Sequence, residues 1–318
     1  MTPISVLPDG RSTSALGFGC ANLFRNDDGA ASQTLIDAAL DSGIRHFDVA
    51  PSYAWGQAEA SLGMALSGHN LEVTIATKVG IRRPAPRSKL AQLRSVGAPF
   101  KRFAPRLWSK LGHAARRTTQ ADTCFVADHV RADLHQSLRE LGVLKIDIYL
   151  LHNVRPADIT TDLVNLLLAK KNDGYIGEIG LGSSYVDCEL IASQWPELAS
   201  VLQFPDREAD HISSRFCITH GAIQHGLHHI RKWRAENEEA ARNLSPKVGI
   251  DLFDDDEIAS ALLGYALSRN EGGIVLFSST RPSRVKRLAA AASDVGFLSA
   301  ACQRLRSGMQ EIDSQRYR

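Results

Sequence analysis

Four side chains capable of proton-transfer chemistry follow apolar runs that are typical of buried strands. Asp48 lies in one such run and Tyr53 just after it, while Lys78 ends a second run and His152 a third. A free tyrosine has a pKa of about 10, so near neutrality it exchanges protons poorly unless a cation lies against it. Lys78 can supply that cation, and a buried lysine stays charged only beside a carboxylate such as Asp48. We therefore expect Asp48 to keep Lys78 charged, so that Lys78 tunes the phenol of Tyr53 as an acid. His152 would then aim a substrate oxygen at that phenol.

Each of these residues has a plainer interpretation when it is considered alone. A single Asp or Lys at a strand end is more often a cap or a rim ion pair, and a lone His after an apolar run is more often a hydrogen-bonded core histidine. The chemical interpretation therefore depends on a fold that brings the four strand ends together.

The elements that must position these side chains alternate between strand-like and helix-like patterns. A Pro-Asp-Gly turn at residues 8–10 predicts a β-hairpin before the alternation begins. Eight β-rich runs then predict strands at Leu16–Gly19, His46–Ala50, Val73–Val79, Ile146–His152, Ile179–Gly182, Val201–Phe204, Phe216–His220 and Ile274–Ser278. Amphipathic helical spacing covers Gln33–Asp41, Glu59–Leu66, Val130–Leu141, Ile159–Lys171 and Ile258–Leu267. The pattern predicts one α/β domain over residues 1–318, a (β/α)8 TIM barrel, with an open doubly wound sheet as the weaker alternative. Active sites of barrels lie at the C-terminal ends of the strands, so the four side chains should meet on one rim.

Composition limits the partners that this chain can have. The chain contains 37 Lys+Arg against 35 Asp+Glu, which gives no overall charge for binding nucleic acid or an anionic membrane. Its five cysteines form no C-x-x-C pair, and the chain begins without a signal-peptide pattern, so we expect reduced thiols and a cytoplasmic location. The histidines of "HGAIQHGLHH" raise a metal site as an alternative, but no nearby cysteine pair or carboxylate completes a ligand set. We expect a monomer or weak homo-oligomer with a small-molecule substrate and no bound metal.

These motifs, in this order, resemble the aldo-keto reductase superfamily. "FDVAPSYAWGQAE" is similar to the family's second-strand signature, Thr77 and Lys78 to its T-K pair, and "SLRELGVLKIDIYLLH" to a third motif. "KNDGYIGEIGLGSS" resembles the element that follows, and the likeness extends from Leu16 to about Ala292. The resemblance implies an NAD(P)-dependent oxidoreductase of the alcohol dehydrogenase type on a TIM barrel. Its catalytic tetrad would consist of Asp48, Tyr53, Lys78 and His152, with Tyr53 as general acid/base. The bacterial branch of aldose and sugar dehydrogenases is broadly similar, which implies an aldehyde, ketone or sugar, or the corresponding alcohol, as substrate.

The same resemblance implies a nicotinamide cofactor, usually NADPH, with NADH as the alternative. Gln203 matches the family glutamine that binds the nicotinamide carboxamide. Arg284 matches the arginine that holds the adenosine 2′-phosphate, for which a bidentate guanidinium is well suited. The other positions implied at the cofactor are Gly19, Cys20, Ser183, His220, Gly221, Ser278 and Ser279.

The departures from the family pattern concentrate at this cofactor site. Gly182 and Ser183 replace a Ser-Asn pair, His220 stands at an aromatic stacking position, and Leu288 replaces an asparagine that contacts adenine. Lost polar contacts of this kind cost about 0.5–1.5 kcal/mol each, so we expect weaker nucleotide binding. The alternative function is a barrel with a weakened nicotinamide site that acts as a ligand-binding or regulatory protein or as a non-redox enzyme.

Two segments stand apart from the barrel pattern by their charge. Residues 82–127 contain 11 Lys+Arg and one acid, and they are far longer than an ordinary connection between a strand and a helix. We interpret them as an inserted basic loop that forms a lid favouring an anionic or polyhydroxylated substrate, or else as a solvated excursion on the barrel rim. Residues 236–257 are predicted to form a surface loop, in which the acidic run "DDDE" caps the next helix.

Overall fold

The computed structural model of the protein describes residues 2–21, 23, 29–69, 72–84, 123–211 and 214–316. Most of the basic segment predicted at 82–127 lies outside the described residues. Its two ends are described, because Ile81 forms an antiparallel bridge with Thr123 and the Cys124 amide donates a 2.8 Å hydrogen bond to the Gly80 carbonyl. The segment therefore leaves and rejoins the described chain next to the strand that carries Lys78.

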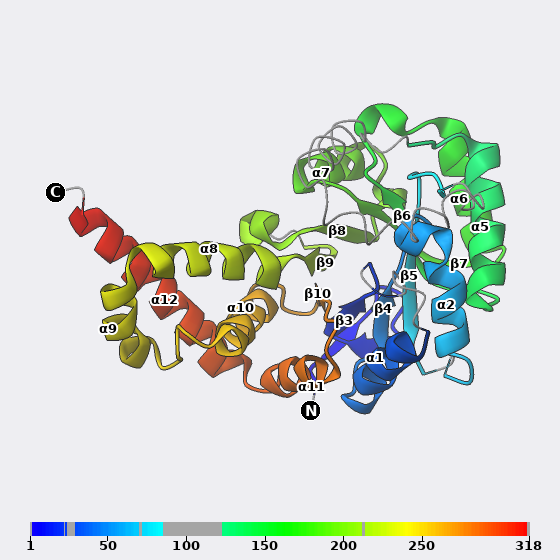
Figure 1. Ribbon diagram of the computed structural model, residues 1–318. Coiled ribbons are helices and arrows are strands. Elements are labelled where there is room, and N and C mark those ends of the chain that lie inside the picture. The colour runs from blue at the N-terminus through cyan, green and yellow to red at the C-terminus, as the bar shows by residue number, and fades with distance from the viewer. Residues whose placement is uncertain are drawn as a thin grey trace, which may run out of the picture.

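Eight parallel strands close into a barrel, which confirms the fold predicted from the sequence (Figure 1). Around the barrel the order is β10-β3-β4-β5-β6-β7-β8-β9, and every neighbouring pair is parallel. The strands are β3 Leu16–Gly19, β4 His46–Asp48, β5 Thr74–Val79, β6 Ile146–His152, β7 Ile176–Gly182, β8 Val201–Pro205, β9 Phe216–His220 and β10 Ile274–Phe277. These strands are buried on both faces, so their sequences are nearly continuous apolar runs rather than alternating ones. The predicted hairpin is also present, as β1 Ile4–Val6 paired with β2 Ser12–Ser14.

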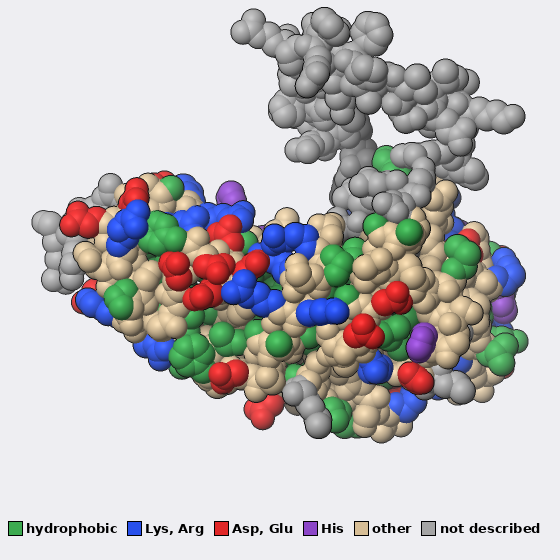
Figure 2. Space-filling view, turned by 60° about the horizontal axis from the view of Figure 1, so that its bottom comes forward, with side chains coloured by type: hydrophobic (Ala, Val, Ile, Leu, Met, Phe, Trp, Pro, Cys, Tyr) green, Lys and Arg blue, Asp and Glu red, His purple; other side chains and the backbone are tan. Residues whose placement is uncertain are grey.

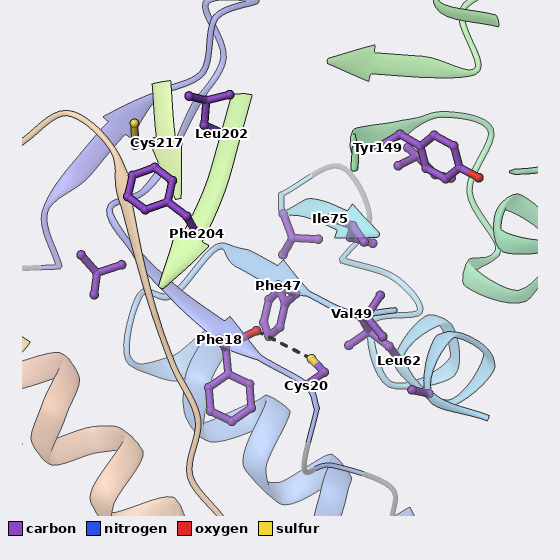
Figure 3. Close-up of a cluster of buried hydrophobic side chains, with 14 of the residues drawn as sticks. Phe18, Cys20, Phe47, Val49, Leu62, Ile75, Tyr149, Leu202, Phe204 and Cys217 are labelled. Atoms are coloured by element: carbon purple, nitrogen blue, oxygen red, sulfur yellow. Dashed lines mark hydrogen bonds between the residues drawn. The ribbon is translucent and has the colours of Figure 1, made fainter. Parts of the chain in front are cut away.

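Helices cover the outside of the barrel. They are α1 Gly29–Asp41, α2 Ala58–Ala65, α5 Ala127–Leu141, α6 Thr161–Asn172, α7 Tyr185–Gln194, α10 Asp255–Arg269 and α11 Pro282–Ala291. Aromatic residues fill part of the core, and Phe18 meets Phe47 and Phe277 edge to face, with ring centroids 6.4 and 5.4 Å apart. Figure 3 shows Phe18 and Phe47 close to Cys20, whose thiol donates a 3.7 Å hydrogen bond to the Phe18 carbonyl. Burial of each such ring stabilises the fold by about 1.5–3 kcal/mol.

The C-terminal helices form a lobe beside the barrel, at the left of Figure 1. The lobe contains α8 Ala222–Glu236, α9 Glu238–Val248 and α12 Val295–Arg316. Helix α10 packs against both the barrel and this lobe. It has a hydrophobic cluster of its own, to which α8 contributes Trp233, α9 contributes Leu244 and α12 contributes Leu305. On the face shown in Figure 2, basic and acidic side chains are intermixed over this lobe. No helix among the described residues has both the length and the apolar character needed to cross a membrane.

The surface loop predicted over residues 236–257 is wrong for most of that range. Helix α9 occupies Glu238–Val248, and it buries Ala241, Leu244 and Val248 along one face. Asn243, Ser245 and Pro246 have weak helix propensities and conceal this helical spacing in the sequence, but burial of the apolar face outweighs them. The predicted cap is present, because Asp254 accepts hydrogen bonds from the amides of Asp256 and Glu257 at the start of α10.

Candidate active site

The structure brings the four predicted proton-transfer residues together at the C-terminal end of the barrel. Asp48 ends β4, Lys78 lies near the end of β5 and His152 ends β6. Tyr53 begins the short 3-10 turn that follows β4, η1 Tyr53–Gly56. All four line one cavity of about 1080 Å³. Adjacent parallel strands end at the same rim, which is why positions far apart in the sequence meet there.

Asp48 and Lys78 form a buried ion pair. The Lys78 ammonium donates to Asp48 Oδ1 at 2.6 Å and to the Val49 carbonyl at 3.0 Å, and the two side chains are 2% and 6% exposed. Burial alone would lower the pKa of Lys78, but the Asp48 charge and hydrogen bond outweigh it and raise that pKa. The lysine is therefore held in its charged form, as the sequence predicts.

The phenol of Tyr53 lies against this pair. The Lys78 ammonium is 5.2 Å from the centre of the Tyr53 ring. Burial raises the pKa of Tyr53 above its ordinary value, and the Lys78 charge offsets only part of that rise. The phenol thus stays protonated near neutral pH, ready to donate its proton. The backbone beyond it is strained, since Ala54 and Trp55 have φ angles of 48° and 59°.

His152 faces Tyr53 across the cavity. The two rings meet edge to face, with centroids 6.4 Å apart. Burial, assisted by the Lys78 charge, lowers the pKa of His152 to about 3. The imidazole is consequently neutral over the physiological range and carries a single N–H that it can donate to a ligand oxygen.

Most of the predicted cofactor positions lie along the same cavity. Gly19, Ser183, Gln203, His220, Gly221, Ser278 and Arg284 line it. Gln203 is beside the ion pair, where its amide donates a 2.7 Å hydrogen bond to Asp48 Oδ2.

Two predicted positions do not line the described cavity. Cys20 is buried, and its backbone amide ties β3 to β4 through the Asp48 carbonyl. Ser279 instead accepts a hydrogen bond from the Arg281 amide, next to the start of α11.

Sequence reasoning missed one wall of this cavity, which is formed by helix α8. Gln224, His228 and Arg231 line the cavity, and their spacing places them on one helical face. No helix is predicted here from the sequence, although the helical spacing of these residues is present in it. Among the described residues, no group of three His, Cys, Asp or Glu side chains could hold a metal ion.

The shape and donors of the cavity suit an extended anionic ligand. Tyr53, Gly221 at the N-terminus of α8 and Arg284 on α11 all line the cavity. Gly221 has φ = 85°, a conformation that other residues adopt only with strain, and it leaves the first amides of α8 open. Helix N-termini of this kind favour phosphate groups. The residues present therefore fit a dinucleotide.

Comparison with known proteins gives one family match and two curated relatives. The model of the aldo/keto reductase family matches residues 15–194. The chain is 30% identical over 186 residues to D-threo-aldose 1-dehydrogenase from a Pseudomonas species, a match that covers 56% of this chain and 52% of that protein. It is 40% identical over 74 residues to pyridoxal 4-dehydrogenase from Microbacterium luteolum, which covers 22% of each chain. The first match thus spans about half the length of the curated relative.

Solved structures share the fold at low sequence identity. A glycerol dehydrogenase from Gluconobacter oxydans superposes with a TM-score of 0.65 and 19% identity, covering 92% of this chain and 94% of that one. An aldo-keto reductase from Bacillus halodurans superposes with a TM-score of 0.69 and 17% identity, covering 97% and 96%. At these identities the likeness establishes the barrel and its surrounding helices alone.

Proposed function

Since the aldo/keto reductase family model matches residues 15–194 of 318, the chain belongs to that family, and on this premise we propose that it interconverts a small carbonyl compound and its alcohol. Membership and the dehydrogenase relatives support an oxidoreductase that uses a nicotinamide cofactor. Tyr53 is the proposed general acid/base, Lys78 and Asp48 are the pair that sets its charge environment, and His152 orients the substrate oxygen.

In carbonyl reduction, the Tyr53 phenol donates its proton to the substrate oxygen. The raised pKa of Tyr53 keeps the phenol protonated near neutrality, and the adjacent Lys78 ammonium stabilises the phenolate that remains after transfer. The N–H of neutral His152 donates a hydrogen bond to the same oxygen and holds it toward the phenol. A bound nicotinamide would supply the hydride. In alcohol oxidation the same phenolate accepts the proton, because the two directions share one pathway.

The observation that carries this proposal is the buried Lys78–Asp48 pair beside Tyr53, in the wall of a cavity large enough for a dinucleotide. Burying an ion pair costs desolvation free energy, which is offset only when the two charges pair closely. Residues in a cleft whose pKa values are perturbed are candidates for catalysis. Gln203 and Ser183 would hold the nicotinamide end of the cofactor. The N-terminus of α8 would bind the pyrophosphate, and Ser278 and Arg284 lie toward the adenosine end. NADPH would be the cofactor if Arg284 were free to bind a 2′-phosphate.

The substrate that we propose is a small polar aldehyde, ketone or sugar, or the corresponding alcohol. The names of the similar proteins point to an aldose, pyridoxal and glycerol, all of them compact and hydroxylated. Ser183, Gln203 and His220 are among the polar residues that line the described cavity, which suits such a compound better than a purely apolar lining would.

One observation favours the alternative of a ligand-binding or non-redox barrel. The amide group of Gln203 donates to Asp48 rather than into the cavity. Nucleotide binding must therefore use the Gln203 carbonyl or the second N–H of its amide, or break that hydrogen bond.

A nucleotide titration separates the two functions. Purified protein would be titrated with NADH and with NADPH while tryptophan fluorescence is followed, and then assayed with a panel of aldoses, simple aldehydes and polyols. We expect saturable binding of a nicotinamide dinucleotide, followed by turnover of at least one of these compounds. If neither nucleotide binds, the oxidoreductase proposal fails and the barrel should be screened for non-redox ligands.

A further inference from the structure

The arginine that would recognise a 2′-phosphate already has an anionic partner. Arg284 lines the cavity, and its Nη2 lies 2.7 Å from Asp256 Oδ1. The two side chains are 21% and 25% exposed, so the pair is largely withdrawn from water. A phosphate that approached Arg284 would have to displace this carboxylate or share the guanidinium with it.

Asp256 is held in place by the start of helix α10. Its backbone amide donates a 2.7 Å hydrogen bond to the Asp254 cap, and its carboxylate lies in the first turn, where the helix dipole favours negative charge. Two further guanidiniums, from Arg281 and Arg287, approach its oxygens at 3.4 Å. These contacts from several directions restrain the carboxylate, which therefore differs from a mobile surface acid.

The neighbouring acid adds to the negative charge at this end of the cavity. Asp255, the next residue in the same turn, hydrogen-bonds Arg231, which also lines the cavity. The pKa of Asp255 is lowered chiefly by that Arg231 hydrogen bond, and Arg284 contributes to the lowering through its charge. Arg231 and Arg284, which line the cavity, are thus each paired with a carboxylate of α10. Arg281 and Arg287, the other two cations beside Asp256, are 60% and 47% exposed and are better screened by solvent.

We propose that Asp256 makes this chain select NADH over NADPH by neutralising and restraining Arg284. The inference rests on the proposed function, since it takes the cavity as a dinucleotide site. A 2′-phosphate carries close to two negative charges at neutral pH, so it would lose Arg284 as a free cation and would be repelled by Asp256. The 2′-hydroxyl of NADH is neutral and is repelled by neither carboxylate. Other dinucleotide folds separate the two cofactors by the same chemistry, with an acid facing the hydroxyl and an arginine facing the phosphate.

The test compares the two nucleotides across a small set of variants. Dissociation constants for NADH and NADPH would be measured by tryptophan fluorescence for the wild type, Asp256→Asn, and Asp256→Asn combined with Arg284→Leu. Glu257→Gln is the matched control, because it removes a charge from the same helical turn, where its carboxylate accepts a hydrogen bond from the Asp251 amide. Melting temperatures would establish that each variant is folded.

We expect the wild type to bind NADH at least about tenfold more tightly than NADPH, and Asp256→Asn to reduce that ratio by about tenfold or more through tighter NADPH binding. Arg284→Leu should cancel this gain, and Glu257→Gln should leave the ratio within about twofold. Tighter NADPH binding by the wild type, or an unchanged ratio in Asp256→Asn, would overturn the selection and leave the oxidoreductase function standing. Failure to bind either nucleotide would instead overturn the function on which the selection rests.

Discussion

At the residue scale, the protonation state of Tyr53 depends on two opposing effects. The sequence predicts that Lys78 makes the phenol a better acid, whereas in the structure burial outweighs the lysine and the pKa of Tyr53 rises. The rise suits proton donation in reduction, because the phenol is protonated at every physiological pH. In the proposed mechanism, Lys78 would act mainly on the phenolate that forms during transfer.

We predict that Tyr53→Phe abolishes turnover and leaves nucleotide affinity nearly unchanged. The substitution removes one hydroxyl and little surface, and loss of a positioned general acid lowers rates by about 10²–10⁴-fold. Steady-state kinetics with the best substrate from the panel, together with a nucleotide titration, would measure both effects.

Tyr149→Phe is the matched control for this substitution. The Tyr149 hydroxyl is buried in the outer layer of the barrel and has no hydrogen-bond partner among the described residues. Its removal should leave kcat intact and the free energy of unfolding equal or slightly higher. Substantial turnover by Tyr53→Phe would contradict the assigned proton donor.

A second residue-scale prediction concerns acid stability and His46. This side chain is fully buried in β4, with its Nδ1 2.9 Å from Thr74 Oγ1, and burial lowers the pKa of His46 to about 4 from its ordinary 6.5. The unfolded chain takes up a proton as the pH falls through 6.5, while the folded chain stays neutral until about pH 4. His46 therefore contributes stability above its unfolded pKa, and that contribution disappears as the pH falls across this window. The loss amounts to roughly 3 kcal/mol at most.

Urea unfolding at several pH values checks this prediction. Between pH 7 and pH 4, the wild type should lose more free energy of unfolding than His46→Asn does. His229→Asn, which removes an exposed histidine on α8, should follow the wild-type curve. Parallel curves for the wild type and His46→Asn would show that burial of this imidazole carries no stability cost at low pH.

At the scale of elements, the turn that carries Tyr53 is fixed by the packing of α2 against α5. Arg83, just beyond β5, donates to Glu59 on α2 at 2.6 Å and to Glu140 on α5 at 2.7 Å. Glu59 also accepts a 2.6 Å hydrogen bond from Thr77, the neighbour of Lys78. One buried network thereby connects the helix after Tyr53, the strand of Lys78 and the helix α5.

Gly63 allows this close approach, and we predict that Gly63→Ala impairs both stability and turnover. A methyl group at this position would lie 2.6 Å from the carbonyl oxygens of Glu140 and Leu141, so α2 would have to move away from α5. Such overpacking costs about 1–3 kcal/mol, and kcat should fall because only Gln57 separates η1 from α2. Thermal melting and kinetics measure the two effects.

Gly296→Ala provides the opposite expectation for the same substitution. Gly296 is in α12 with nothing within 4 Å of the added methyl group, so alanine should stabilise the helix by about 0.5–1 kcal/mol. A Gly63→Ala protein with unchanged melting temperature and kcat would show that the α2–α5 contact does not position Tyr53.

At the scale of the whole molecule, the barrel was predictable from the sequence and the lobe was not. Each strand is a short apolar run between stretches of helical spacing, so it can be recognised from its own residues and their neighbours. Closure of the barrel then brings the ends of β4, β5 and β6 to one rim. The lobe helix α9 contains a proline, and its identity as a helix depends on packing against α8, which directly precedes it, and against α12, which is distant in sequence. The Asp256–Arg284 pair was equally hidden, because no local pattern indicates which acid will face an arginine on another helix.

Residues of the lobe helix α8 and of the barrel strand ends line the same cavity, so damage to the lobe should affect nucleotide binding more than chemistry. We predict that Leu244→Ala, in α9, lowers the free energy of unfolding by about 2–5 kcal/mol and weakens NADH binding, while kcat at saturating NADH stays close to that of the wild type. The reason is that α8 and α10, which carry His228, Arg231 and Asp256, pack on this cluster, whereas the tetrad lies on the barrel. Leu166→Ala is the matched control, since both leucines are 8% exposed and Leu166 packs in the barrel cluster from α6. It should lose similar stability in urea without losing NADH affinity. If both variants weakened NADH equally, the lobe would have no separate role in shaping the cofactor site.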